Sequence, residues 1–276
     1  MLHADNKASE QFIHIWQEAF GDTEEEIRGF FKACEGRERI LTWEEGGETA
    51  GQCVLIPATF LGKRIWYIYA VATAMPFRRQ GVCTKLLCAV RNLLAREGSG
   101  AVLVPADDAL AQFYEKRGFF SLFLGEKTVV TEDKNTVSKG HDKNVIPRVD
   151  MVDIDIETYL NIRKKEFSLS CVIDLPKSLL VYAVRQHVAG GSELKKLLWN
   201  EKEYGILYEK QGSGILVREI TAADGEEARQ AVLAFLLNMG EKTAWLQRSY
   251  PTYAIGMDRY TLRYPRQQGY FNLVLD

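Results

Sequence analysis

The sequence predicts an α/β protein of two domains, and three observations support this prediction. The chain has 276 residues, which is close to two domains at roughly 150 residues each. Its first half alternates extended apolar runs with helical periodicity, in the order strand, helix, strand, helix, strand, and this order favours an α/β layer over an all-β sandwich. A stretch from 131 to 150 then mixes acidic and basic residues without any aromatic residue, as linkers do.

The elements of the first half follow from apolar spacing and from turn residues. Apolar residues at helical spacing predict helices, whereas short apolar or alternating runs predict strands. Gly46 and Gly47 predict the turn of a hairpin, and Gly98 and Gly118 predict helix ends. The expected elements are helices at 9–20 and from 22, strands at 39–43, 48–61 and 63–73, a helix from 82 to near 98, a strand at 100–105, a helix from 107 to near 117, and a strand at 119–130.

The second half repeats the order helix, helix, strand, strand, strand, helix, strand. Its expected elements are helices at 154–167 and 176–188, strands at 194–199, 204–209 and 215–221, a helix at 224–237, and strands at 243–247 and 253–264. No sequence repeat accompanies this order, so a duplication is inferred from element order alone. We therefore expect domains at 1–135 and 151–276, joined by a linker at 136–150.

Composition excludes several classes of function. The chain is 46% hydrophobic and 26% charged, with 35 basic and 37 acidic residues, so it offers no basic field for nucleic acid or for an anionic membrane. Its apolar runs fall far short of the roughly 20 residues that span a bilayer. The N-terminus has no basic segment leading into an apolar one, and we expect a cytoplasmic protein.

Cysteine and histidine spacing argues against a metal site. The five cysteines are scattered without a C-x-x-C pair, and the four histidines lie far apart. Reduced thiols and no bound metal are therefore expected.

The most informative stretch is the turn between the strand ending at Thr73 and the helix starting at Val82. The first N–H groups of a helix lack internal partners and favour an anion. Arg78 and Arg79 add positive charge, and Gly81 lets the main chain approach a phosphate. The competing interpretation is a solvated loop. Neither a P-loop nor a dinucleotide fingerprint is present, since Gly212-Ser-Gly214 lacks a third glycine and a following helix.

The segment Arg78-Arg79-Gln80-Gly81-Val82-Cys83 resembles the motif Q/R-x-x-G-x-G/A of the GNAT superfamily of acyl-CoA-dependent N-acyltransferases. Cys83 stands where glycine or alanine is usual, and its small size keeps the departure tolerable. Val71-Ala72-Thr73 on the preceding strand and the segment 113–119 (Phe-Tyr-Glu-Lys-Arg-Gly-Phe) also fall where the family has such residues. The resemblance covers about residues 1–135 and implies a GNAT fold, with a mixed central sheet flanked by helices.

The resemblance implies acetyl-CoA as co-substrate and an amine, either a small molecule or a peptide, as acceptor. Main-chain N–H groups at the turn would bind the CoA diphosphate, and exposed backbone on the preceding strand would pair with the pantetheine arm. Tyr114 matches the family position that often protonates the departing sulfur, although it could also simply pack on the sheet. The expected CoA-binding residues are Val71, Thr73, Arg78, Arg79, Gln80, Gly81, Val82, Cys83 and Thr84.

The general base is not identified by the sequence. By the period of two, Tyr69 should face the same side as Val71 and Thr73, but no carboxylate lies on this strand. A water chain, a carboxylate of the second half, or the C-terminal carboxylate of Asp276 could serve. No histidine lies near Cys83 or Cys88 in the sequence, so direct transfer is preferred to a covalent intermediate.

Aromatic residues crowd the same strand. Trp66, Tyr67 and Tyr69 suit a cationic or amphipathic amine acceptor, or simply pack in the core.

The second half has no Arg-x-x-Gly turn. Thr221-Ala-Ala-Asp-Gly-Glu-Glu227 occupies the corresponding place, and its acids would repel a diphosphate. We therefore expect a degenerate GNAT-like domain that completes the acceptor pocket without binding CoA. The leading hypothesis is an acetyl-CoA-dependent N-acetyltransferase. The alternatives are a CoA-binding sensor without turnover and an aminoacyl transferase using charged tRNA, against which the lack of a basic stripe counts.

Overall fold

The computed structural model describes residues 1–5, 7–131, 149–168, 171–257 and 269–272. These residues form two compact units. Unit 1 combines Met1–Leu124 with Ile173–Tyr182 and the described part of Pro251–Gln268, whereas unit 2 combines Gly125–Val172, Ala183–Tyr250 and the described part of Gly269–Asp276. Each unit therefore contains segments that are distant in the sequence.

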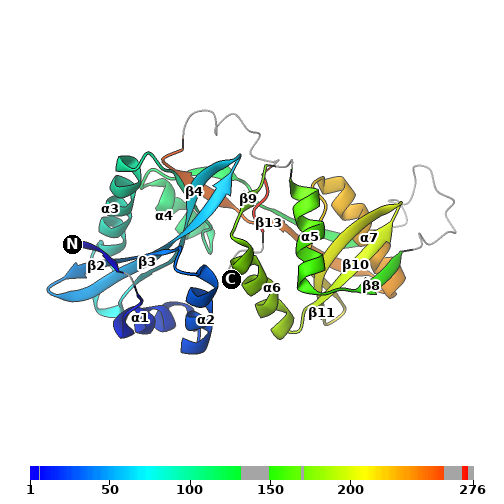
Figure 1. Ribbon diagram of the computed structural model, residues 1–276, viewed down its shortest axis with the longest axis horizontal. Helices are drawn as coiled ribbons and strands as arrows, with labels where there is room; N and C mark the ends of the chain where they lie inside the picture. The colour runs from blue at the N-terminus through cyan, green and yellow to red at the C-terminus, as the bar shows by residue number, and fades with distance from the viewer. Residues whose placement is uncertain (6, 132–148, 169–170, 258–268, 273–276) are drawn as a thin grey trace. The chain divides into compact units, whose positions relative to one another are not determined.

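Unit 1 is built on a mixed sheet (Figure 1). The only parallel neighbours among its described strands are β4 and β5, which confirms the mixed sheet. In spatial order its strands are β1 (Leu2–Asp5), β2 (Arg39–Glu45), β3 (Glu48–Phe60), β4 (Lys63–Thr73), β5 (Ala101–Leu103), β14 (Thr252–Ile255) and β6 (Phe120–Phe123), and β9 (Ile173–Asp174) pairs with β3.

Helices cover both faces of this sheet (Figure 1). One face packs against α3 (Val82–Arg96) and α4 (Asp108–Glu115) through a cluster that includes Leu86, Val90 and Ile68. The other face packs against α1 (Glu10–Phe20) and α2 (Glu24–Cys34), where Trp16 lies 5.3 Å from Phe30 between ring centroids. A short 3-10 helix, η1 (Met75–Phe77), connects β4 to the turn before α3.

A β-bulge interrupts β4 at Ala70, whose φ is 49°. Gln52 of β3 pairs with Ala72, whereas Val54 pairs with Tyr69, so β4 contains one extra residue between these pairs. An extra residue reverses the alternation of side chains along a strand. The expected common face of Tyr69 with Val71 and Thr73 is therefore wrong.

The packing shows the same reversal. The Tyr69 ring lies 5.6 Å from that of Trp16 on the α1 face, whereas Val71 packs in the cluster on the α3 face. Trp66 also packs in that cluster, on the opposite face of the strand from Tyr69. The aromatic residues of this strand thus do not form one continuous wall.

Strands β4 and β5 separate soon after they pair. Their parallel register is limited to Trp66 with Ala101 and Tyr67 with Val102, while β4 continues to Thr73. The N–H of Ala74 donates to the carbonyl of Ala50 at 3.0 Å, on the β3 side. Because successive peptide groups of a strand point to opposite sides, the backbone of Thr73 faces the opening between β4 and β5.

Unit 2 has a second mixed sheet with the same central feature, a single parallel pair among its described strands, here β12 with β13. Its helices are α5 (Ile156–Phe167), the C-terminal part of α6 (Lys177–Ala189) and α7 (Gly225–Met239). Its strands, in spatial order, are β7 (Glu126–Thr131), β13 (Thr243–Ser249), β12 (Gly214–Ile220), β11 (Lys202–Gln211), β10 (Glu193–Trp199) and β8 (Asp150–Asp153).

Two predicted strands also require correction. The strand expected at 119–130 is two strands, β6 in the sheet of unit 1 and β7 in the sheet of unit 2. The strand expected at 253–264 is β14, which ends at Ile255 and lies between β5 and β6 in unit 1, and residues 258–264 lie outside the described residues. Strand pairing across such distances has no local sequence signal.

The expected linker at 136–150 lies outside the described residues, except for Val149 and Asp150. Within the described part of the chain, no helix combines the length and the apolar character needed to cross a bilayer.

We predict that Gly51→Ala destabilises unit 1. A Cβ at Gly51 on β3 would lie 2.9 Å from Cγ1 of Val82, the first residue of α3, and 3.4 Å from the carbonyl oxygen of Ala72. Valine has little χ1 freedom, so the helix start must move. The expected loss is about 1–3 kcal/mol in the free energy of unfolding, measured by urea denaturation.

Gly190→Ala is the matched control. Its added Cβ would meet only carbonyl oxygens at 3.4 Å, so the expected change is within about 0.5 kcal/mol. Equal denaturation midpoints for the two variants would contradict the close approach of β3 and α3.

Candidate functional site

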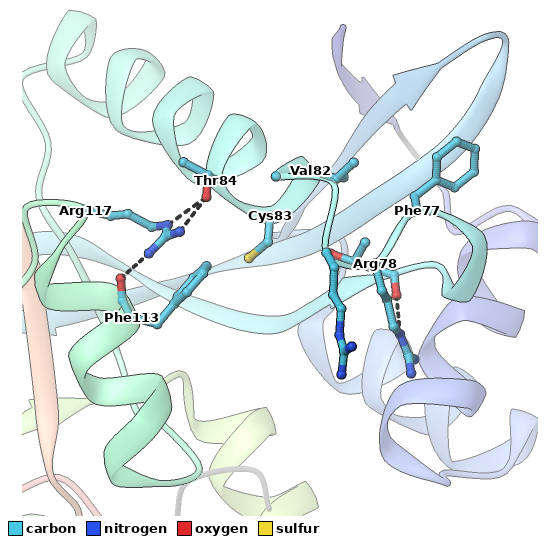
Figure 2. A pocket seen from close by; sticks show the side chains of 10 residues that line it. Phe77, Arg78, Val82, Cys83, Thr84, Phe113 and Arg117 are labelled. Carbon is cyan, nitrogen blue, oxygen red and sulfur yellow. Dashed lines mark hydrogen bonds between the residues drawn. The ribbon is translucent and has the colours of Figure 1, made fainter.

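A cavity of about 350 Å³ lies at the start of α3 in unit 1 (Figure 2). Its walls come from the end of β4, from η1, from the turn before α3, from the first turn of α3 and from α4 with the residues that follow it. It is lined by Thr73, Phe77, Arg78, Arg79, Gly81, Val82, Cys83, Thr84, Phe113 and Arg117.

Most of the residues expected to bind CoA are brought together here, and two are not. Gln80 does not line the cavity, because its Nε2 donates to the carbonyl of Pro76 at 2.7 Å and closes the turn. The side chain of Val71 packs in the core cluster instead. Phe77, Phe113 and Arg117 line the cavity without having been assigned a role from the sequence, although the last two belong to the segment 113–119.

The turn presents unpaired main-chain donors to the cavity. Gly81 is the N-cap of α3, with φ 80° and no side-chain cap, and Arg79 also has a positive φ of 62°. The first main-chain bond of the helix runs from the N–H of Lys85 to the carbonyl of Gly81 at 3.0 Å. The N–H groups of residues 82–84 therefore have no carbonyl partner within the helix. Such groups favour an anion.

The described part of the cavity wall carries positively charged side chains and no acidic one. Arg78, Arg79 and Arg117 line the cavity, and none forms an ion pair with a described residue. Other arginines of unit 1 do, as in the pairs Arg28–Glu24 and Arg39–Glu97. The side chain of Arg78 is directed by a hydrogen bond from Nε to the carbonyl of Thr73, 3.1 Å away.

Arg117 joins the end of α4 to the first turn of α3. Its Nε and Nη2 donate to Oγ1 of Thr84 at 2.9 and 2.6 Å, and its Nη1 donates to the carbonyl of Phe113 at 2.6 Å. The guanidinium carbon lies 3.2 Å from the centre of the Phe113 ring. This arrangement fixes a cation in the cavity wall (Figure 2).

Tyr114 lies beside the cavity rather than in its lining. It is 7% exposed and packs against Phe119, with ring centroids 5.5 Å apart. Burial raises the pKa of its phenol well above the usual value, and the nearby thiols of Cys83 and Cys53 act in the same direction. The hydroxyl therefore stays protonated at neutral pH.

The thiol of Cys83 lines the cavity, and Figure 2 shows its sulfur directed towards the side where Phe113 lies. Burial raises the pKa of this thiol to about 11, against a smaller opposing effect of Arg117. Since the thiolate is the nucleophilic form, Cys83 is a poor nucleophile at neutral pH. This agrees with direct transfer.

In unit 2 the opening between the parallel strands is filled by the chain itself. Side-chain Nδ2 of Asn272 donates to the carbonyl of Arg218 on β12 at 2.9 Å and to that of Gln247 on β13 at 3.0 Å. The N–H of Phe271 donates to Oγ of Ser249 at 3.1 Å. Residues 269–272 thus occupy the place that corresponds to the opening beside Thr73 in unit 1.

A buried carboxylate holds this segment. Glu219 on β12 is fully buried and accepts hydrogen bonds from the hydroxyls of Tyr159 and Tyr270 at 2.6 and 2.5 Å. Arg163, also buried, donates through Nε at 3.1 Å. Because Tyr270 belongs to the C-terminal segment, Glu219 ties that segment to the sheet.

The helix that follows β12 is also capped, unlike α3. Asp224 is the N-cap of α7, and its Oδ1 accepts from the N–H of Glu227 at 2.9 Å. A carboxylate thus occupies the place where a diphosphate would bind. The filled opening and the capped helix give two physical reasons to expect no CoA site in unit 2.

The described residues that line the cavity include neither aspartate nor glutamate, so none of them supplies a carboxylate as general base. Asp276, whose terminal carboxylate is a candidate from the sequence, lies outside the described residues. Over those residues, no group of three or more His, Cys, Asp or Glu side chains is arranged to hold a metal ion.

Comparison with known proteins finds a family model that matches the first part of the chain. Residues 4–119 match the model of the acetyltransferase (GNAT) family. No curated protein matches the chain significantly.

Solved structures share the fold across both units. A protein of Enterococcus faecalis V583 named as a probable N-acyltransferase has a TM-score of 0.71 at 13% identity, over 92% of this chain and 72% of its own. A GCN5-related N-acetyltransferase of Anabaena variabilis has a TM-score of 0.63 at 17% identity, over 97% and 69%. A tandem GNAT protein from the clavulanic acid biosynthesis pathway has a TM-score of 0.50 at 11% identity, over 94% and 99%. At such identities the likeness shows the fold, here one with GNAT-type architecture.

We predict that Cys83 reacts slowly with iodoacetamide at pH 7.5. Its pKa of about 11 leaves far less thiolate than a free cysteine with a pKa of about 8.5 has, so we expect a rate at least about tenfold lower. The rate should rise with pH up to about 11. Peptide mass spectrometry measures the modification, with Cys83→Ser as the assignment control, and a rate equal to that of free cysteine would contradict the burial effect.

Proposed function

Residues 4–119 match the model of the acetyltransferase (GNAT) family, and from this match we propose that the protein transfers the acetyl group of acetyl-CoA to a primary amine. The observation that carries the proposal is the start of α3, where uncapped N–H groups and arginines without an acidic partner among the described residues line one cavity. Acyl transfer is the chemistry common to the family and to the N-acyltransferases of the same fold.

The diphosphate of acetyl-CoA would bind at the N-terminus of α3. The N–H groups of Val82, Cys83 and Thr84 precede the first hydrogen bond of the helix and have no partner within it. The helix dipole adds partial positive charge there. Arg78 and Arg79 supply full charges beside them. Gly81 meets nothing within 4 Å at its Cβ position, so the approach of a phosphate to this backbone is open.

The thioester would lie in the opening between β4 and β5. The backbone of Thr73 faces this opening and Thr73 also lines the cavity. A strand N–H donating to the thioester carbonyl stabilises the oxyanion that forms on attack, because the dipole is already oriented.

In the proposed reaction the amine nitrogen attacks the thioester carbon directly. A C–N bond forms, the C–S bond breaks, and the amine loses a proton to water. The departing sulfur takes a proton, which we assign to Tyr114. Its hydroxyl is protonated at neutral pH, and the thiol of Cys83, which lines the cavity, contributes to the raised pKa of this hydroxyl.

A second candidate function is a CoA-binding sensor without turnover. The described residues that line the cavity include no carboxylate, and this favours the sensor, because none of these side chains can take the proton of an ammonium group. Binding of CoA is common to both candidates, and turnover distinguishes them.

The test is thiol release from acetyl-CoA across a panel of small amines and peptides. The proposal predicts amine-dependent release, with Arg78→Ala raising the KM for acetyl-CoA about tenfold. Arg64→Ala, an exposed arginine at the start of β4, is the control and should leave KM unchanged. Binding of acetyl-CoA without release on any amine would overturn catalysis in favour of the sensor.

We predict that Tyr114→Phe lowers kcat about 100-fold or more, which is typical of removing a general acid, with the affinity for CoA changed less than about twofold. Tyr253→Phe removes a hydroxyl from β14 of the same unit and should leave kcat unchanged. An unaltered kcat for Tyr114→Phe would show that Tyr114 only packs against the sheet.

The protonation state of Tyr114 also determines how kcat/KM should depend on pH. Burial raises the pKa of Tyr114 above its usual value, so the acid stays protonated as pH rises towards about 10. The value of kcat/KM should therefore increase as the amine loses its proton and then stay level to about pH 10. A fall beginning near pH 8 would contradict a buried tyrosine as the acid.

A further inference from the structure

We infer that Arg117 and Thr84 form a second anion subsite, which binds the 3′-phosphate of coenzyme A and makes the protein select CoA over 3′-dephospho-CoA. The inference rests on the proposed function, since it assigns a further part of the same ligand. Three arginines line the cavity, and they do not all lie on the same element.

The cavity holds more positive charge than a diphosphate requires. Arg78 and Arg79 lie in the turn before α3, whereas Arg117 reaches the first turn of α3 from the end of α4. Figure 2 shows Arg78 and Arg117 on different sides of that turn. No ion pair with a described residue neutralises either of them.

Arg117 is held in a fixed position with donors to spare. A guanidinium has five N–H groups, and hydrogen bonds to Thr84 and Phe113 use one each on Nε, Nη1 and Nη2. One N–H on each terminal nitrogen is left for a ligand. The Phe113 ring supports the guanidinium plane from 3.2 Å, so binding a phosphate would order little that is not already ordered.

Thr84 adds a donor to the same subsite. Its Oγ1 accepts both Nε and Nη2 of Arg117, and a hydroxyl that accepts still has its own proton to donate. Thr84 also lines the cavity. A phosphate oxygen beside this pair would receive charge-assisted bonds from the arginine and a bond from the hydroxyl.

Coenzyme A contains an anion of the kind this pair would bind. Besides the diphosphate, it carries a phosphate monoester on the ribose, with a charge of about −1.5 to −2 at pH 7. A thioester on a carrier protein has the pantetheine arm but lacks this monoester. The subsite would therefore favour free CoA thioesters as acyl donors.

The test is calorimetric titration of the full chain with CoA and with 3′-dephospho-CoA. We expect the wild-type protein to bind CoA about tenfold more tightly. Arg117→Gln should raise the Kd for CoA about tenfold and change the Kd for 3′-dephospho-CoA by less than about twofold. Lys116→Gln removes the neighbouring exposed charge and should keep the preference.

A second variant distinguishes loss of the subsite from loss of the folded structure. Arg117→Lys keeps the charge without the planar fork and should retain part of the preference. Equal wild-type affinity for the two ligands, an unchanged preference in Arg117→Gln, or an equal loss of affinity for both ligands would each overturn the subsite. Failure of the wild-type protein to bind either ligand would instead contradict the proposed function itself.

Discussion

The proposed coenzyme A site depends on the uncapped first turn of α3. Gly81 is the N-cap of this helix and has no side chain that could cap it. The strand that leads to the turn, β4, has a β-bulge at Ala70 and separates from β5 before it ends. Free main-chain donors at a helix start are stable when they face water or an anion. The arginines beside this turn have no acidic partner among the described residues, so the electrostatics and the backbone geometry favour the same kind of ligand.

The two units have the same sheet pattern, but they differ at the opening between the parallel strands. Both have a single parallel strand pair followed by an opening, among the strands described. In unit 1 the opening adjoins a cavity, whereas in unit 2 Asn272 bridges the two strands and Asp224 caps the helix. The buried Glu219, with its tyrosine and arginine donors, makes removal of that segment costly, since it would leave a buried charge with fewer partners.

Local signals in the sequence were enough to predict most of the helices, the hairpin, the basic turn and the GNAT resemblance, because each depends on neighbouring residues. The exchange of β7 and β14 between the sheets depends on pairing across more than a hundred residues, which periodicity does not encode. The bulge at Ala70 reversed the predicted face of Tyr69, since one extra residue shifts a period of two. The role of Arg117 depends on contacts with Thr84 across two helices, and so the segment 113–119 alone could not reveal it.

The most direct test of the central claim is a crystal structure of the protein with coenzyme A. We expect the diphosphate within hydrogen-bonding distance of the N–H groups of residues 82–84, with the pantetheine arm entering the opening beside Thr73. A diphosphate bound elsewhere, or a start of α3 that stays empty at saturating coenzyme A, would contradict it.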